Sequence, residues 1–202
     1  MAHGELTARM ARKLSPKPKF RGYDVLFDHG DKEIDPPDKV GRIVSWFGSE
    51  YRRHARLAFL DIAVVSRDSG KVFALIEIEE STSKPKVLLG DVLATLLGDK
   101  ITFQGKRDLK VGEWTNLIVI AYTNETAQIA FLQNKINRLR PQLSTPNAAI
   151  GQIVMDTFGG ESELETKLTE AIERALPNAD SLIRYLFDFS PNATYNLPQE
   201  TK

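Results

Sequence analysis

Two apolar runs separated by a short polar turn dominate the pattern of hydrophobic positions along the chain. Residues 57–65 and residues 72–79 are rich in aliphatic and β-branched side chains, and residues 68–70 between them are Asp-Ser-Gly. The glycine can adopt the positive φ that a three-residue hairpin turn requires. The pattern therefore predicts a β-hairpin in which Arg67 pairs with Lys71.

Three acidic residues interrupt the apolar pattern of this hairpin. In the predicted register Asp61 lies opposite Glu77, and Glu79 shares their face because side chains alternate along a strand. A four-residue turn, or a slip of one residue, would place Asp61 on the opposite face. Both faces are otherwise apolar, which is typical of a sheet covered on both sides.

Carboxylates inside such a sheet need a compensating partner. Removing an unpaired carboxylate from water costs several kcal/mol, so the cluster must be neutralised by protonation, by Lys or Arg, or by a metal cation. Oxygen ligands suit Mg²⁺, Mn²⁺ or Ca²⁺. The chain has no cysteine and only three histidines, which argues against a zinc site.

Helical periodicity and further apolar runs fill the rest of the chain. Val40, Ile43, Val44, Phe47 and Tyr51 recur at helical spacing after Pro36-Pro37, which predicts a helix ending near residue 53 or 54. The other predicted helices are residues 6–14, residues 87–98 with Ser83 as cap, one opening at Asn124, one with a Ser162-x-x-Glu165 capping box, and residues 181–187. Strands are predicted at residues 23–27, 116–122 and 150–158, with one or two more within 99–111.

Composition favours one domain and leaves a nucleic-acid partner open. The chain has 202 residues, 42% of them hydrophobic, and its 27 basic residues balance 27 acidic ones. The charges are unevenly placed, because residues 1–21 hold six bases and one acid, whereas residues 156–202 hold nine acids and four bases. We interpret residues 1–22 as a basic arm, residues 23–189 as a single α/β domain and residues 190–202 as a flexible tail.

Targeting signals are absent from the sequence. No apolar run approaches 18 residues, and the N-terminal stretch mixes Glu5 with Arg9, Arg12 and Lys13. The sequence therefore predicts a cytoplasmic protein with no membrane partner.

Asp61, the hairpin and the triplet Glu77-Ile78-Glu79 resemble the PD-(D/E)xK nuclease superfamily, over roughly residues 37–123. Two positions depart from that family's pattern. Leu60 stands where proline is frequent, and Glu79 stands where lysine is usual. Some restriction endonucleases similar to BamHI carry the same Glu-x-Glu form.

The resemblance implies a central mixed β-sheet flanked by helices, with a restriction-endonuclease-like core, and hydrolysis of DNA. It implies Mg²⁺, with Mn²⁺ as a substitute, bound by Asp61, Glu77 and Glu79 with help from the Ile78 carbonyl. Glu50 lies about 20° from Ile43 on a helical wheel, so it could join the metal cluster or form an ion pair with a core-edge arginine. Lys86, or alternatively Lys84, could supply the cation that Glu79 does not.

Basic residues near this cluster are candidate DNA contacts. The candidates are Arg52, Arg53, Arg56, Lys84 and Lys86 around the predicted site, with Lys17 and Lys19 in the basic arm. Each is equally compatible with a solvated surface, and a homodimer is compatible with the sequence. Two other interpretations remain: a non-catalytic relative that binds DNA or protein, favoured by Glu79 in place of lysine, and an unrelated α/β protein in which the motif is accidental.

Overall fold

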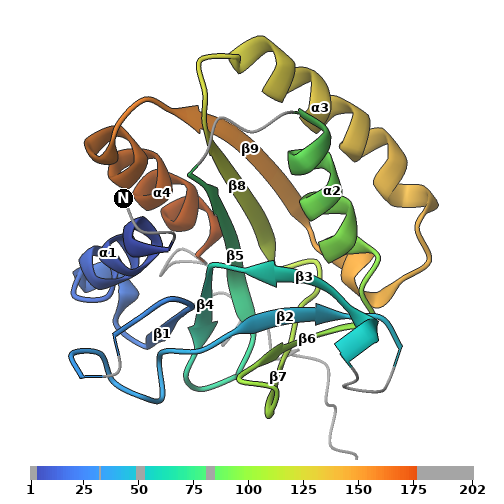
Figure 1. Ribbon diagram of the computed structural model, residues 1–202. Coiled ribbons are helices and arrows are strands. Elements are labelled where there is room, and N and C mark those ends of the chain that lie inside the picture. The colour runs from blue at the N-terminus through green and yellow to red at the C-terminus, as the bar shows by residue number, and fades with distance from the viewer. Residues whose placement is uncertain (1–3, 32, 49–52, 81–84, 177–202) are drawn as a thin grey trace, which may run out of the picture.

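The computed structural model describes residues 4–31, 33–48, 53–80 and 85–176. Within that part the chain forms two β-sheets and four α-helices (Figure 1). In chain order the elements are α1 (Glu5–Leu14), β1 (Tyr23–Phe27), β2 (Ile43–Trp46), β3 (Arg56–Leu60), β4 (Ile62–Ser66), β5 (Val72–Glu79), α2 (Pro85–Leu96), β6 (Lys100–Phe103), β7 (Arg107–Leu109), β8 (Asn116–Tyr122), α3 (Thr126–Leu139), β9 (Gln152–Phe158) and α4 (Glu161–Ala175).

The larger sheet has five strands in the order β1-β4-β5-β8-β9. Strands β1, β4 and β5 are antiparallel neighbours, whereas β5, β8 and β9 run parallel to one another. The β5–β8 connection passes through α2, and the β8–β9 connection passes through α3. The prediction of an α/β fold with a mixed sheet is confirmed, and the predicted strands 23–27 and 116–122 match β1 and β8.

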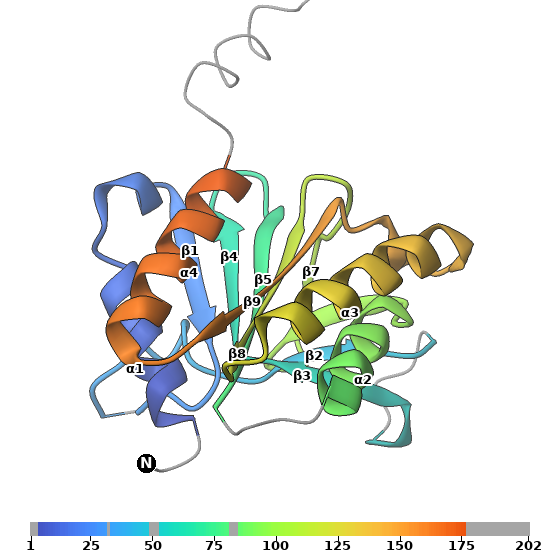
Figure 2. The ribbon, with the colours of Figure 1, turned by 90° about the horizontal axis from the view of Figure 1, so that it is seen from above.

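Helices cover both faces of the five-stranded sheet. Helices α1 and α4 lie together on one side, and α2 and α3 lie on the other (Figures 1 and 2). Each side has its own hydrophobic core, because alternate residues of β5 point to opposite faces: Ile76 and Ile78 belong to the α1–α4 side and Leu75 to the α2–α3 side. This explains why neither strand of the hairpin shows an apolar-polar alternation.

The predicted helix after Pro36-Pro37 is wrong, because that segment enters a second sheet. The four strands of this sheet, in the order β3-β2-β6-β7, are all antiparallel. All four residues of β2 are buried, so the strand lacks the alternation that would have distinguished it from a short piece of helix. Glu50, which was assigned to that helix, lies outside the described residues.

The first predicted strand of the hairpin is divided at Asp61. Residues before it form β3 in the second sheet, and residues after it form β4 in the five-stranded sheet. A single continuous strand was predicted because the apolar run 57–65 has no glycine or proline to mark a boundary. Asp61 therefore marks the junction between the two sheets.

The N-terminal segment is part of the domain and not a separate arm. The predicted helix is present as α1, and Leu6, Met10 and Leu14 on it are buried in the core shared with α4. Residues 18–20, which we expected to be extended, form a 3₁₀ turn that buries Phe20. The segment looked like a solvated arm because of its basic residues, but on α1 these residues occupy one face of an amphipathic helix whose other face is apolar and buried.

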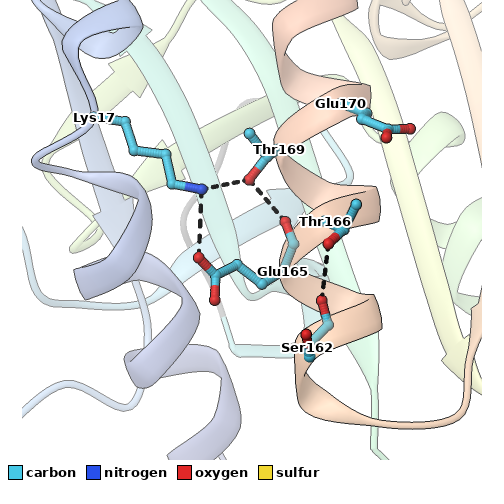
Figure 3. A pocket seen from close by; sticks show the side chains of 6 residues that line it. All are labelled: Lys17, Ser162, Glu165, Thr166, Thr169 and Glu170. Atoms are coloured by element: carbon cyan, nitrogen blue, oxygen red, sulfur yellow. Dashed lines mark hydrogen bonds and ion pairs between the residues drawn. The ribbon is translucent and has the colours of Figure 1, made fainter.

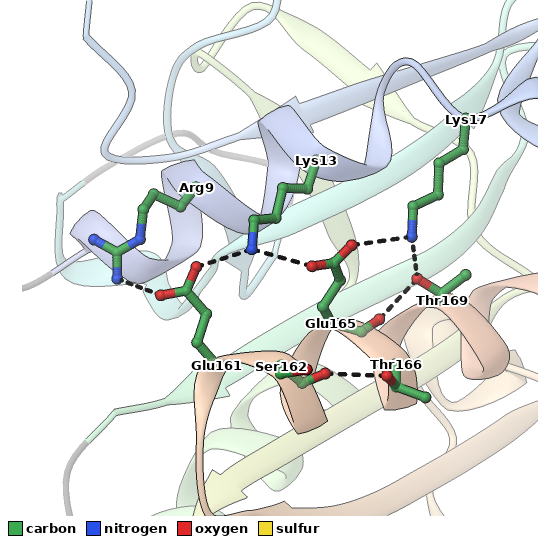
Figure 4. A network of polar contacts seen from close by, with 8 residues as sticks. All are labelled: Arg9, Lys13, Lys17, Glu161, Ser162, Glu165, Thr166 and Thr169. Carbon is green, nitrogen blue, oxygen red and sulfur yellow. Dashed lines mark hydrogen bonds and ion pairs between the residues drawn. The ribbon is translucent and has the colours of Figure 1, made fainter.

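The basic residues of this segment pair with acids on α4. Lys13 lies within 3.0 Å of both Glu161 and Glu165, and Arg9 lies 3.1 Å from Glu161 (Figure 4). Lys19 pairs with Glu173 at 2.6 Å. Basic residues of the N-terminal segment thus form ion pairs with acidic residues of α4, which the separate net charges of the two segments did not reveal.

Helix α4 begins one residue earlier than its predicted capping box. Ser162 lies inside the helix and does not cap it, and the carboxylate of Glu163 accepts a hydrogen bond from the Gly159 N–H at 2.8 Å instead. The predicted helix 181–187 and the tail 190–202 lie outside the described residues. None of the helices in the described ranges has the length and apolar character needed to span a membrane.

Candidate active site

Asp61 is held against β5 by its backbone and by its side chain. Its N–H donates to the Ile76 carbonyl at 3.0 Å, and its Oδ2 accepts a hydrogen bond from the Ile78 N–H at 2.7 Å. Ile62 pairs with Ile76 in the β4–β5 ladder, so the next position along places Asp61 opposite Glu77. Continued by one position, the register of this ladder agrees with the predicted place of Asp61 opposite Glu77.

The turn reaches this register by a route that the sequence did not reveal. Ser66, and not Arg67, bonds to Lys71, which leaves a four-residue turn containing Gly70 at a φ of +68°. That turn alone would have placed Asp61 on the wrong face. A β-bulge restores the register, because Val64 pairs with Ala74 but Val65 pairs with Val72, so that Phe73 is an extra residue.

Burial dominates the electrostatics of Asp61. It raises the pKa of this carboxyl to about 6, although the Ile78 N–H and the nearby His29 oppose the shift. The buried hydroxyl of Thr7, on α1, lowers the pKa slightly but completes no full hydrogen bond. The charge of Glu80 raises the pKa further, so negative charge accumulates around Asp61.

Glu77 is the most constrained carboxyl of the site. Burial raises its pKa well above the ordinary value, and the charges of Asp61, Asp91 and Glu79 raise it further. The residue is only half-buried as a whole, yet its Oε2 is fully buried and has no hydrogen-bond partner. A buried carboxylate oxygen without a partner is costly, so this atom indicates a missing cation or proton.

Asp91 is a site residue that the sequence analysis did not identify. It lies on α2, and burial followed by the charge of Glu79 raises its pKa. Its signal was present in the sequence, because Asp91 is the single acid in the otherwise apolar helix that follows the hairpin. Thr7 gave no such signal, since only the fold brings α1 to Asp61.

No lysine or arginine in the described ranges forms a salt bridge with Asp61, Glu77 or Asp91. The ion pairs of those ranges join other residues, chiefly between α1 and α4 and around Asp24. No three of the described acidic or histidine side chains are grouped closely enough to hold a metal ion as they stand. The site thus presents two facing carboxylates, Asp61 and Glu77, with Glu79 and Asp91 beside them.

The predicted DNA contacts fall into three groups. Lys17 and Lys19 are remote, because they follow the C-terminal end of α1, whose ten residues span about 15 Å, whereas Thr7 near Asp61 lies in its first turn. Lys17 instead lines a shallow hollow of about 360 Å³ on α4 and contacts Glu165 and the Thr169 hydroxyl (Figure 3). Both lysines therefore have partners within the chain.

The second group consists of Lys86, Arg53 and Arg56. Lys86 is exposed in the first turn of α2, where the helix dipole adds positive potential. Arg53 is exposed in the short 3₁₀ turn before β3, and Arg56 opens that strand five residues ahead of Asp61. The third group, Arg52 and Lys84, lies outside the described residues.

Comparison with known proteins identified no relative of this chain: no family model, no curated protein and no solved structure matches it. Functional inference therefore depends on the geometry and chemistry of the carboxylate cluster.

Proposed function

We propose that this protein is a Mg²⁺-dependent nuclease that hydrolyses DNA phosphodiester bonds, with Mn²⁺ as a substitute for Mg²⁺. One observation carries the proposal. The buried Oε2 of Glu77 has no hydrogen-bond partner, the charge of Asp61 acts on this carboxyl, and no lysine or arginine of the described ranges forms a salt bridge with either residue. A divalent cation would satisfy both carboxylates.

The connectivity of the larger sheet supports a restriction-endonuclease-like core. Leaving aside the strands of the second sheet, β2–β3 before β4 and β6–β7 before β8, a helix precedes three antiparallel strands and a second helix precedes a parallel strand, in the order α1, β1, β4, β5, α2 and β8. Asp61 immediately precedes the second of these strands, and Glu77 and Glu79 lie at the end of the third. This is the order that the sequence resemblance implies, although α1 takes the place of the helix that was expected at residues 36–54.

The donor set suits magnesium in particular. Mg²⁺ usually keeps several waters and is held by one or two carboxylates together with substrate phosphates. Asp61 and Glu77, with the Ile78 carbonyl, provide such a partial set, so a group of three carboxylates is not required. A cation held by these residues would lower the pKa of a bound water and would offset negative charge on the leaving oxygen.

The remaining residues position water and substrate in this proposal. Glu79 orients the attacking water, and Asp91 lies beside it with a raised pKa, which makes its carboxylate a better proton acceptor near neutral pH. Lys86 and Arg56 bind the phosphates that flank the scissile bond. These roles require no lysine at position 79.

A non-catalytic nucleic-acid-binding module is the second candidate. It is favoured by Glu79 in the position where the resembled family has lysine, and by the lack of a three-carboxylate group among the described residues. Cleavage of plasmid DNA in Mg²⁺, in Mn²⁺ and in EDTA separates the two candidates. The nuclease cuts with either metal and not in EDTA, whereas absence of cleavage with both metals contradicts the proposed activity.

The Glu79→Lys variant is expected to lower cleavage and Mn²⁺ affinity together, each by at least about tenfold, because an ammonium replaces a group that acts through the metal or its water. Calorimetric titration with Mn²⁺ and a cleavage assay measure the two effects. If the Glu79→Lys variant cleaved DNA while the parent protein did not, and its Mn²⁺ affinity were unchanged, the parent protein would be a catalytically inactive relative in which Glu79 replaces the lysine of the motif.

A further inference from the structure

The second sheet has an outer face that does not contribute to either hydrophobic core. Its inner face contains Ile43, Leu60 and Ile101, which are fully buried on the α2 side. Phe59 of β3 pairs with Val44 of β2 and alternates with Leu60, so its ring points outward and is 45% exposed. Val44 and Thr102 on the same face are buried, so the exposed part of this face is the Phe59 ring, which is a potential contact surface.

Two arginines flank this ring. The guanidinium carbons of Arg42 and Arg56 each lie 5.5 Å from the centroid of Phe59. Arg56 also donates to the backbone carbonyl of Arg53, so Arg53, whose side chain is exposed, is its neighbour at the same end of the sheet. We call Arg42, Arg53, Arg56 and Phe59 the Phe59 surface.

The charge of the Phe59 surface is not neutralised as it is elsewhere in the molecule. Among the described residues no carboxylate forms a salt bridge with any of its three arginines, whereas Arg9, Lys13 and Lys19 near the N-terminus all have such partners. Asp108 of β7 is the nearest acid on the outer face by strand register, and it pairs with Thr102 across the ladder. The surface therefore keeps a positive excess.

We propose that the Phe59 surface binds single-stranded DNA. Exposed bases stack on aromatic rings and on guanidinium planes, and the same guanidinium groups contact the phosphates. A duplex hides the faces of its bases, so it could use the arginines but not the ring. The complementary charge and the exposed aromatic together select a single strand.

The position of Phe59 connects this surface with the proposed function. Phe59 precedes Asp61 by two residues, so their Cα atoms are at most about 7 Å apart. The inference that a strand bound here is the one that is cut rests on the proposed function. Binding itself does not, because no metal takes part in it.

Fluorescence anisotropy with a labelled thymidine 20-mer in EDTA tests the binding. Replacing Phe59 by alanine is expected to raise Kd about tenfold by removing one stacked base, whereas Phe59→Trp should bind as well as the parent protein. Arg42→Ala and Arg56→Ala should each reduce the slope of log K against log salt by about 0.7. All four side chains are at least partly exposed, so folding should be retained.

The matched control is Phe131→Ala on α3. Phe131 is 60% exposed, and the Lys135 Nζ lies 5.2 Å from its ring centroid. It therefore matches Phe59 as an exposed aromatic residue beside a basic side chain, but on a different element. Its replacement should leave Kd unchanged. The proposal is overturned if the parent protein does not bind the oligonucleotide, if a duplex of equal length binds more tightly, or if Phe59→Ala and Phe131→Ala behave alike.

The two proposals fail separately in a single comparison. Asp61→Asn should retain binding of the thymidine 20-mer in EDTA while losing cleavage in Mg²⁺. Binding without any cleavage by the parent protein would contradict the proposed nuclease activity and would support DNA binding by the Phe59 surface. If Phe59→Ala changed neither cleavage nor binding, this would contradict DNA binding by the Phe59 surface and would leave the nuclease proposal standing.

Discussion

Asp61→Asn and Glu77→Gln are each expected to reduce Mg²⁺-dependent DNA cleavage by about a thousandfold or more. A metal ion in such a site contributes several kcal/mol of charge stabilisation in the transition state, and each 1.4 kcal/mol corresponds to about a factor of ten in rate. Both substitutions retain side-chain size, so the β4–β5 ladder should persist. Initial rates on plasmid DNA, measured over a range of Mg²⁺ concentrations, quantify the loss.

A matched carboxylate outside the site provides the control for this experiment. Glu170 lies on the exposed surface of α4, and Glu170→Gln should cleave DNA at the parental rate (Figure 3). Circular dichroism and the melting temperature establish that all variants are folded. Parental cleavage rates in both Asp61→Asn and Glu77→Gln would eliminate these carboxylates as the catalytic centre.

The metal-free protein is expected to lose stability as the pH rises from about 4 to about 7. Asp61 has a pKa near 3.8 when unfolded and about 6 when folded, so the folded state binds more protons within this window and the free energy of unfolding falls with rising pH. The melting temperature of the metal-free protein should therefore fall as the pH rises through this window. The raised pKa of Glu77 acts in the same direction.

Other carboxyls of the chain do not mask this effect. Burial raises the pKa of Asp24, but hydrogen bonds from Lys39 and Arg67 outweigh it and lower the net value, while the hydrogen bond from Arg12 lowers the pKa of Asp35. Their contributions to stability are therefore complete above about pH 4. The slope between pH 5 and pH 7 reports mainly on the candidate site.

Magnesium should restore the stability that the metal-free protein loses as the pH rises. Ten millimolar MgCl₂ is expected to raise the melting temperature at pH 8 but not at pH 5, because protonated carboxyls do not bind the ion. Sodium chloride of equal ionic strength serves as the control, and Asp61→Asn should flatten the pH slope. A metal-free melting temperature that increases between pH 5 and pH 7 would be incompatible with the two raised pKa values.

The sequence predicted the fold best where local pattern and tertiary environment agree. The run ending in Glu77-Ile78-Glu79 matches β5, and the apolar helix after it matches α2. The opposite happened at residues 43–46, where spacing typical of a helix came from a strand that is buried on both faces. Only its pairing with β3 and β6 distinguishes the two structures, and this pairing is not encoded in local periodicity.

The sequence analysis identified Asp61 and Glu77 as the centre of the candidate site, but it did not identify Asp91 and Thr7 beside them. Asp61 and Glu77 were placed opposite each other by register, although the turn is one residue longer than expected and the bulge at Phe73 compensates for it. Asp91 carried a visible signal as a lone acid in an apolar helix. Thr7 beside Asp61 and Arg42 beside Phe59 reach their positions through contacts between segments that are distant in the sequence, which no local pattern specifies.

The most direct test of the nuclease proposal is anomalous diffraction from crystals soaked in MnCl₂. We expect a Mn²⁺ peak between the carboxylates of Asp61 and Glu77, within about 2.0–2.3 Å of an oxygen of each. Crystals of Asp61→Asn should lack this peak. Crystals that contain Mn²⁺ elsewhere but show no peak at this pair, or show a lysine or arginine side chain between the two carboxylates, would contradict it.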